Sequence, residues 1–456
     1  SRFRMSISNA RWQIVEENFL VANVDPITRL VQQCDPNEAL LPADPRFVDF
    51  SAARGTHVLE IIERQLRRAG SKPERLLFAG HLGIGKSSLL KRLQAQLEGE
   101  EHASGKFVVV WVDTTKQLDP NDLDFPDLLV LLAAETQRRL KAAEVPGFTE
   151  PSVRLKSLWE SCKGVLGSKV RLSEAEIDVP FGSLTLEIRN QPSARSALRE
   201  AIENLATELT SAFNQLLQDA NEAVRRQGGA GLVLIVDGLE KMSRRETPDG
   251  VNTHDRLFIN RSTQLASIET NIIYTVPISL YYSPQCTVLE QAFGEFNAPV
   301  PMIKVRPGRT EEVSQKSIGM QCLWEMLSLR CKASDVEFTD VFPDDTVWPY
   351  LCEMSGGHPR HLLMLLRAAA NQLDELPITK KAAEQAVRTY ANSLLREIPD
   401  EFWDQLRNFD TPQEDILRDD VHQKMLYFLH VFEYQNGRPW YEVNPVIRTL
   451  ERYLDV

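Results

Sequence analysis

A glycine-rich stretch near residue 80 carries the residue types most able to do chemistry. It reads Gly80-His-Leu-Gly-Ile-Gly-Lys-Ser87 and fits the pattern G-x-x-x-x-G-K-[ST]. Glycines let a loop turn its backbone N–H groups inward around a phosphate without Cβ clashes. The lysine would reach the terminal phosphates of a nucleotide, and the serine hydroxyl would ligate Mg²⁺. The predicted nucleotide-binding residues are Gly80, Gly83, Gly85, Lys86, Ser87 and Ser88.

A second acidic group follows an apolar run that is typical of a buried strand. Residues 232–236 are all aliphatic, and Asp237 comes directly after them. Strands of an open α/β sheet present ligand-binding groups at their carboxyl ends, so Asp237 is predicted to hold Mg²⁺ directly or through water. Glu240 is a candidate for polarising the attacking water. A solvated loop carboxylate is the alternative interpretation of Glu240.

Thr275 lies at the end of a third apolar run, residues 272–276. Its hydroxyl would contact the γ-phosphate or the water, or else it is a buried threonine satisfied by backbone groups. The predicted catalytic set is therefore Lys86, Asp237, Glu240 and Thr275. This set implies ATP as the nucleotide and Mg²⁺ as the metal, with Ser87 and Asp237 as the metal ligands.

Short apolar runs alternate with helical patterns around these residues. Strands are predicted over 76–79, 107–112, 232–236, 272–276 and 302–305. Helices are predicted over 86–97, 127–143, 256–267 and, as one long amphipathic element, 197–226. The alternation predicts an α/β fold with a parallel sheet covered on both faces.

Beyond residue 309 the pattern becomes almost wholly helical, with helices predicted over 309–332, 345–355, 358–374 and 379–397. Asn436–Gly437, between two largely apolar runs, predicts a hairpin and hence a winged-helix ending. A short helix over 11–21 and a hairpin within 177–188 are also predicted. The predicted domains are an N-terminal arm (5–50), a P-loop ATPase core (51–308, with an insertion at about 145–195), a helical lid (309–398) and a winged-helix domain (399–456).

Composition narrows the function classes. The formal net charge of −12 gives no global attraction for nucleic-acid phosphates. Residues 400–456 hold six Lys/Arg and twelve Asp/Glu, which disfavours DNA binding by the winged helix. The six cysteines form no CxxC pair, so reduced thiols in a cytoplasmic protein are expected. The sequence contains no run of 18 apolar residues, so no membrane-spanning helix is expected.

The P-loop, Asp237, Thr275 and the helical tail together resemble the AAA+ and STAND branch of P-loop ATPases, of prokaryotic type. Classical AAA+ members place Glu directly after the strand-end Asp, whereas this chain has Gly238 there. The form Asp-Gly-Leu-Glu resembles STAND ATPases, the signalling class with NACHT and NB-ARC proteins. The resemblance therefore implies a slow ATPase rather than rapid, continuous turnover.

The stretch Gly356-Gly-His-Pro-Arg360 resembles two family features. In STAND proteins a Gly-x-Pro motif places Pro359 near the adenine. In origin-recognition-type initiators a second-sensor arginine, here Arg360, touches the γ-phosphate. The alternative is a glycine turn before a helix that begins with proline. Arg54 lies where such families begin the wall on the adenine side.

The leading hypothesis is a nucleotide-controlled switch, in which γ-phosphate contacts move the lid and the winged helix. The resemblance implies a homo-oligomer, a protein effector or both, and a role in prokaryotic antiviral defence or stress signalling. The alternative is a DNA-acting AAA+ ATPase, an initiator or a transposition-type loader, using basic clusters such as Arg244–Arg245 or Arg64–Arg68. Candidates for a trans-acting arginine finger are Arg256, Arg261 and Arg306.

Overall fold

Four parallel strands form the sheet that positions the predicted site, in the order β1-β4-β3-β2. The computed structural model describes residues 24–99, 105–148, 153, 156–157, 192–203, 205–247, 250–294, 299–409 and 419–454. The strands are β1 (Arg75–Gly80), β2 (Phe107–Asp113), β3 (Gly231–Asp237) and β4 (Asn271–Pro277). All four lie where the apolar runs predicted them, so the α/β fold class with a parallel sheet is confirmed.

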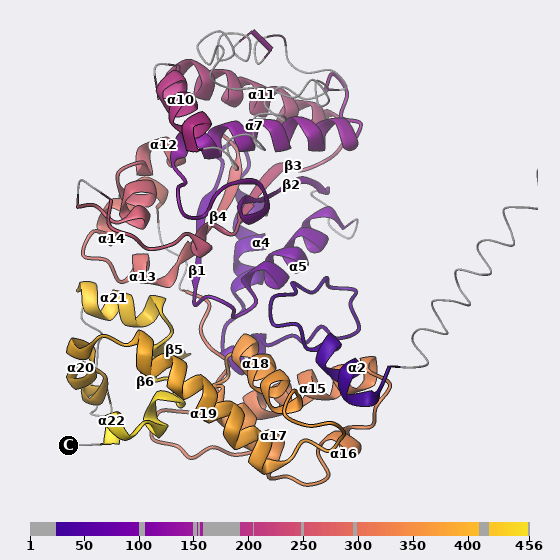
Figure 1. Cartoon of the computed structure of the whole chain (residues 1–456). Coiled ribbons are helices and arrows are strands. Elements are labelled where there is room, and N and C mark those ends of the chain that lie inside the picture. Colours follow the sequence, from indigo (N-terminus) through magenta and orange to yellow (C-terminus); the bar gives the residue numbers. More distant parts are fainter. Residues whose placement is uncertain are drawn as a thin grey trace, which may run out of the picture. The chain divides into compact units, whose positions relative to one another are not determined.

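Helices cover both faces of this sheet, because its strands are apolar on both sides. On one face α7 (Phe125–Ala142) packs on β2 and α11 (Ala206–Arg226) packs on β3, with α10 (Pro192–Glu203) against α7. On the other face lie α5 (Lys86–Glu98) and α4 (Val58–Arg68) (Figure 1). The π-helical turn (Asp255–Ile259), α12 (Ser262–Ala266), α13 (Ile278–Tyr281) and α14 (Cys286–Phe293) contribute apolar residues to the same core as α7, α10 and α11. The short helix α6 (Thr114–Gln117) directly follows β2.

By density of contacts the chain divides into two compact units. Unit 2, Thr56–Pro301 with Gln413–Val431, contains the sheet, its helices and α21 (Asp420–Tyr427). Unit 1 contains Ser1–Gly55, Met302–Pro412 and Phe432–Val456. The domain boundaries expected from the sequence remain a prediction.

Unit 1 is mainly helical. Its helices are α2 (Pro26–Gln33), α3 (Ser51–Arg54), α15 (Ile318–Ala333), α16 (Phe338–Val341), α17 (Val347–Met354), α18 (Pro359–Ala370), α19 (Lys380–Glu397), α20 (Trp403–Asn408) and α22 (Glu451–Leu454). Strands β5 (Val431–Asn436) and β6 (Arg438–Val443) form a two-stranded sheet joined at Gly437, which confirms the predicted hairpin. Tyr434 stacks on Trp440 with ring centroids 4.3 Å apart, so these aromatic side chains pack within the hairpin.

Three predicted elements are wrong. Residues 302–305 form no strand, because Met302 N–H donates to the Glu433 carbonyl and Lys304 N–H to the Ala53 carbonyl. Only Val300 extends the sheet, by a parallel bridge to Gly80. The long helix over 197–226 is broken near Leu205, which has the non-helical angles φ −116° and ψ 7°.

The third is the helix predicted from 309, which begins only at Ile318. Ser317 caps this helix by accepting the Met320 N–H at 3.3 Å, so the capping signal outweighs the polar residues before it. The predicted helix over 11–21 and the hairpin within 177–188 lie outside the described residues.

Two further sequence-based expectations concern thiols and membranes. Cys34, Cys286, Cys322, Cys331 and Cys352, the cysteines within the described ranges, are free thiols. No helix in the described part of the chain combines the length and hydropathy needed to cross a bilayer.

Candidate nucleotide site

The glycine-rich loop joins β1 to α5 and leaves no room for larger residues at its start. A Cβ on Gly80 would lie 2.7 Å from Ile84 Cδ1. Gly83 and Gly85 have φ angles of 82° and 92°, in the left-handed region that favours glycine. Gly85 is the N-cap of α5, so the positive end of this helix points at the loop. The geometry is that of an anion-binding turn.

The strand order places this loop at a switch point of the sheet. The connection after β1 crosses to β2 at the far edge, whereas the connection after β4 leads to Val300 on the other side of β1. The crevice between β1 and β4 therefore opens at their carboxyl ends, where ligands bind in open α/β sheets.

Lys86 is buried at this crevice, with 3% of its surface exposed. Its Nζ donates to the carbonyls of Gly80 and His81, both at 2.9 Å. The same Nζ lies 3.6 Å from Glu240 Oε1. These contacts place the ammonium group between the loop carbonyls and the Glu240 carboxylate.

Glu240 is only 3% exposed, so the interpretation as a solvated loop carboxylate is wrong. It lies on a short turn, Leu239–Lys241, that follows Gly238. Gly238 has φ 94°, and a Cβ there would lie 2.6 Å from Thr115 Cγ2. A glutamate directly after Asp237 would therefore be strained, and the chain instead brings its second acid in three residues later.

Asp237 is 4% exposed, and its carboxylate accepts a hydrogen bond from the Ser87 hydroxyl. Burial and the nearby Glu240 charge raise the pKa of Asp237 to about 6. Burial also opposes ionisation of Glu240, but Lys86, the Thr275 hydroxyl and Lys241 together lower its pKa below the ordinary value. The two acids thus have different environments, and Glu240 is the one paired with the buried cation.

Thr275 is fully buried at the end of β4. Its Oγ1 accepts the N–H groups of Gly238 and Leu239, at 3.0 and 3.2 Å, and donates to the Val236 carbonyl at 3.2 Å. These contacts fix the turn that carries Glu240. The contact of Thr275 with phosphate or water remains a prediction.

The donor set at this crevice fits Mg²⁺. Among the described residues, neither Asp237 Oδ1 nor Glu240 Oε2 has a hydrogen-bond partner, although both atoms are buried. Mg²⁺ prefers oxygen ligands and is usually held by one or two carboxylates together with substrate phosphates. Ser87 and Asp237 supply two such oxygens side by side. The described part of the chain holds no cluster of three or more His, Cys, Asp or Glu side chains able to ligate a metal.

Three residues around the site were missed from the sequence. Asp113 ends β2 in register with Asp237, and Thr114 Oγ1 donates to the Asp237 carbonyl at 2.9 Å. The sequence could have indicated Asp113, because it directly follows the apolar run 107–112 just as Asp237 follows the run 232–236. The third, His81, lies inside the motif at a position where any residue fits the pattern.

His81 links the loop to α21. It is fully buried, burial lowers its pKa to about 3, and its neutral ring donates from Nδ1 to the Leu426 carbonyl at 3.1 Å. Tyr427 OH donates to the Met242 carbonyl at 2.7 Å, two residues beyond Glu240. Arg244 and Asp420 form an ion pair at 2.7 Å. One helix thus contacts both the phosphate loop and the segment after Glu240.

The other predicted residues lie in unit 1. Pro359 is the first residue of α18, and Gly356 and Gly357 before it have φ angles of 59° and 75°. Arg360 Nε donates to the Pro36 carbonyl at 3.2 Å. Arg54 is buried beside the Phe50 ring, and burial lowers its pKa to about 10. Nucleotide contacts of Pro359, Arg360 and Arg54 remain predictions.

The arginine-finger candidates differ in their surroundings. Arg261 pairs with Asp124 and Glu203, and Arg306 lies 3.5 Å from Glu442. Arg256 is exposed and makes no side-chain hydrogen bond or ion pair with the described residues.

The two basic clusters predicted as possible DNA contacts also differ in their surroundings. Arg244 is engaged with Asp420, whereas Arg64 and Arg68 are exposed one turn apart on α4.

Three solved structures are similar to this chain, each at low sequence identity. Cdc6p from Pyrobaculum aerophilum has 12% identity and a TM-score of 0.39, covering 93% of this chain and 96% of its own. A Walker-type ATPase of Pyrococcus abyssi has 12% identity and a TM-score of 0.41, covering 91% and 99%. The Aeropyrum pernix Orc1 protein, solved in complex with DNA, has 14% identity and a TM-score of 0.37, covering 91% and 94%.

No protein-family model and no curated protein matches the chain. At these TM-scores no residue role is transferred from the three structures.

Because the pKa of Asp237 is raised, we expect Asp237→Asn to stabilise the folded chain by an amount that depends on pH. Because the folded pKa, about 6, lies above the ordinary 3.8, the folded state binds the proton more tightly, and stability falls as pH rises from about 4 to 6. Asparagine stays uncharged at every pH, so the variant does not lose this stability as pH rises. In Mg²⁺-free buffer, chemical denaturation should show Asp237→Asn about 2 kcal/mol more stabilising at pH 7.5 than at pH 4.

Asp113→Asn is the control, because Thr115 and Lys116 hold the pKa of Asp113 below its ordinary value although burial opposes this. Its stabilising contribution is lost as pH falls, so this substitution should show the opposite pH trend. The same trend in both variants would contradict the assignment.

The buried pair predicts non-additive effects of Lys86 and Glu240 on stability. Lys86→Ala leaves Glu240 buried without its cation and should cost roughly 3 kcal/mol at pH 7.5. Glu240→Gln in the same chain should recover most of that loss, which a double-mutant cycle in denaturant measures. Additive effects would show that the two groups do not interact.

Proposed function

We propose that this chain binds ATP with Mg²⁺, hydrolyses it slowly and acts as a nucleotide-controlled switch. The observation that carries the proposal is the buried cluster of Lys86, Asp237 and Glu240 beside a glycine turn and a helix N-terminus. A structural salt bridge alone would leave no reason for two unpartnered carboxylate oxygens at this crevice.

Each residue then has a distinct task. Backbone N–H groups of the loop and the N-terminus of α5 bind the phosphates. Ser87 and Asp237 hold the metal, which when bound neutralises charge on the phosphates. Asp237, with a pKa of about 6, is mainly ionised at pH 7.5 and becomes fully so beside a cation.

Lys86 changes partners when the nucleotide binds. Its ammonium group bonds to two loop carbonyls and lies 3.6 Å from Glu240 Oε1, so a γ-phosphate that draws the ammonium group away weakens its pairing with Glu240. The release of Glu240 frees a carboxylate to orient water in line with the γ-phosphorus. The water oxygen–phosphorus bond forms, the bond to the ADP oxygen breaks, and the water proton passes to Glu240 and then to phosphate.

Slow turnover follows from the same competition. Glu240 is held in the buried pair, and the turn that carries it is fixed by Thr275. Freeing the base therefore costs part of the pair energy in every cycle. The buried pair thus favours a switch rather than a motor, as the family resemblance also does.

The switch output is proposed to pass through α21. This helix bonds to His81 in the phosphate loop and to Met242 after Glu240, so movement of either changes its contacts. The chain continues from α21 through residues 428–430 into β5. Nucleotide state is thereby linked along the chain to the hairpin.

Three finer proposals rest on the resemblance. The ATP-bound chain forms a homo-oligomer or binds a protein effector, with Arg256 as the preferred arginine finger because it is exposed and unengaged by the described residues. Arg360 and Pro359 are kept as proposed nucleotide-binding residues. The biological setting is prokaryotic defence or stress signalling, with ATP-dependent action on DNA as the alternative.

ATP binding and hydrolysis should separate in two variants. Lys86→Ala/Glu240→Gln, which avoids an unpaired buried charge, should lose ATP binding in isothermal titration. Glu240→Gln should keep binding and lower phosphate release at least 100-fold, because it removes the base.

Glu246→Gln is the matched control, an exposed carboxylate a few residues beyond Glu240, and should leave both quantities unchanged. Mass photometry of the native chain with and without ATP reads out assembly on the same samples. Undiminished ATP affinity in the double variant would reject the nucleotide site.

The coupling through His81 predicts nucleotide-dependent hydrogen exchange in α21. Mg²⁺-ATP should change amide exchange of residues 422–427 in the native chain. In His81→Ala these amides should exchange about ten-fold faster and no longer respond to ATP, because the bond to the Leu426 carbonyl is lost. His81→Asn, whose amide can donate, should restore part of the response. If amide hydrogen exchange of α21 in the native chain did not change with Mg²⁺-ATP, coupling through His81 would be excluded.

A further inference from the structure

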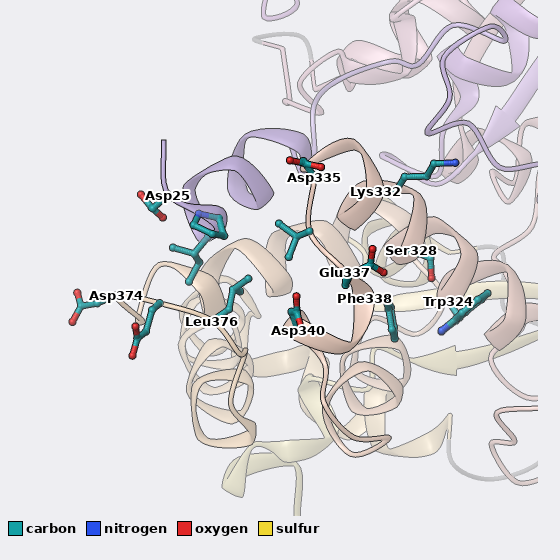
Figure 2. A pocket seen from close by; sticks show the side chains of 14 residues that line it. Asp25, Trp324, Ser328, Lys332, Asp335, Glu337, Phe338, Asp340, Asp374 and Leu376 are labelled. Atoms are coloured by element: carbon teal, nitrogen blue, oxygen red, sulfur yellow. The ribbon is translucent and has the colours of Figure 1, made fainter. Parts of the chain in front are cut away.

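A cavity of about 1010 Å³ lies within unit 1, apart from the residues of the nucleotide site. Its walls come from the start of α2, one side of α15, the segment 335–340 and the loop 374–376. Figure 2 shows Trp324 and Phe338 toward one end of this cavity and Asp25 and Asp374 toward the other, with Glu337 and Asp340 between them. Neither the proposed ATP chemistry nor the packing of unit 1 uses this cavity.

One end of the cavity is aromatic. Trp324 and Phe338 meet edge to face with ring centroids 5.6 Å apart. Trp324 is 42% exposed, so the aromatic pair presents apolar surface beside the hollow. Tryptophan is enriched among the residues that contribute most to binding at protein interfaces.

The rest of the cavity is strongly acidic. Six carboxylates and one lysine line it: Asp25, Asp335, Glu337, Asp340, Asp374, Glu375 and Lys332. Glu337, Asp340, Asp374 and Glu375 are exposed and make no side-chain hydrogen bond or ion pair with the described residues. These carboxylates repel one another in the free protein, so a cationic group bound in the cavity would reduce that electrostatic repulsion.

A buried hydroxyl also faces this hollow without a partner. Ser328 lines the cavity, and no described residue bonds to its Oγ, although that atom is buried. A helical serine commonly bonds back to the carbonyl four residues earlier, but Ser328 does not. The lining of the cavity thus includes one polar group that the described residues leave unsatisfied.

We infer that this cavity docks an extended basic segment of a partner protein, with an apolar side chain on Trp324 and Phe338 and arginine or lysine along the acidic stretch. The aromatic pair lies at one end of the cavity and Asp25 and Asp374 at the other, which suits a segment with an apolar end and a basic end (Figure 2). The volume is at the upper limit of small-molecule pockets, about 300–1,000 Å³. Nucleic acid is excluded, because its phosphates would meet the same carboxylates.

The chain's own N-terminal residues are a poorer match. Residues 1–23 contain three arginines, Arg2, Arg4 and Arg11, and two glutamates, Glu16 and Glu17, a net side-chain charge of +1. They therefore bring little positive charge to six carboxylates. A partner segment rich in arginine is the better complement.

The test uses the full chain and a fluorescein-labelled, amidated peptide of two leucines followed by four arginines. Fluorescence anisotropy should give a dissociation constant on the order of 10 µM at low salt. Trp324→Ala and Asp374→Asn/Glu375→Gln should each weaken binding about ten-fold. Glu312→Gln/Glu401→Gln, which neutralises two exposed carboxylates of unit 1 outside the cavity, should leave binding unchanged. Thermal unfolding confirms that each variant is folded.

Two control peptides and one truncation complete the design. Glutamates in place of the arginines should abolish binding, and serines in place of the leucines should weaken it about ten-fold. Equal affinity for the glutamate peptide, equal effects of both carboxylate pairs, or no saturable binding of the arginine peptide would overturn the inference. A chain lacking residues 1–23 that binds the probe much more tightly would show that the occupant is the chain's own segment.

Discussion

The nucleotide site depends on one buried cation. Lys86 holds two loop carbonyls in place and compensates Glu240, which could not remain ionised at this depth without it. The consequence reaches Asp237, whose own pKa is raised because burial and Glu240 both oppose its charge. Lys86 is the buried cation here, and its charge alone does not neutralise both carboxylates. A metal ion and its phosphates are the natural completion of such a site.

The sheet order explains why the turn before Glu240 is so tightly packed. Strand β4 lies between β1 and β3, so the loop and Asp237 belong to strands about 10 Å apart. The first turn of α5 crosses the end of β4 to let Ser87 reach Asp237. Thr275 lies beneath this crossing, fully buried, and its hydroxyl holds the turn after Asp237. Gly238 is the residue that lets the turn pass Thr115.

Local signals were enough for the sheet and for the members of the site, but not for their surroundings. Continuous apolar runs located all four strands, and the loop motif located Lys86 and Ser87, because both signals are written in adjacent residues. The strand predicted over 302–305 failed because its N–H groups bond to Glu433 and Ala53, partners more than 100 residues away. Burial of Glu240 was hidden for the same reason, since it depends on Lys86 more than 150 residues earlier in the chain. Asp113 was within reach, because its apolar run ends as that of Asp237 does.

The position of α21 is the part of the fold with most consequence for the proposed switch. In sequence it adjoins the hairpin, yet it packs on α13 and bonds to His81 and Met242 within the sheet-bearing unit. A helix fixed only by apolar contacts could slide without changing the phosphate loop. Here the neutral, fully buried ring of His81 donates a hydrogen bond to the Leu426 carbonyl of α21. The backbone carbonyl of His81 accepts a hydrogen bond from Lys86. In the proposed switch, a ligand that draws Lys86 toward phosphate would act on the same residue that holds α21, so phosphate binding and helix position would both depend on His81.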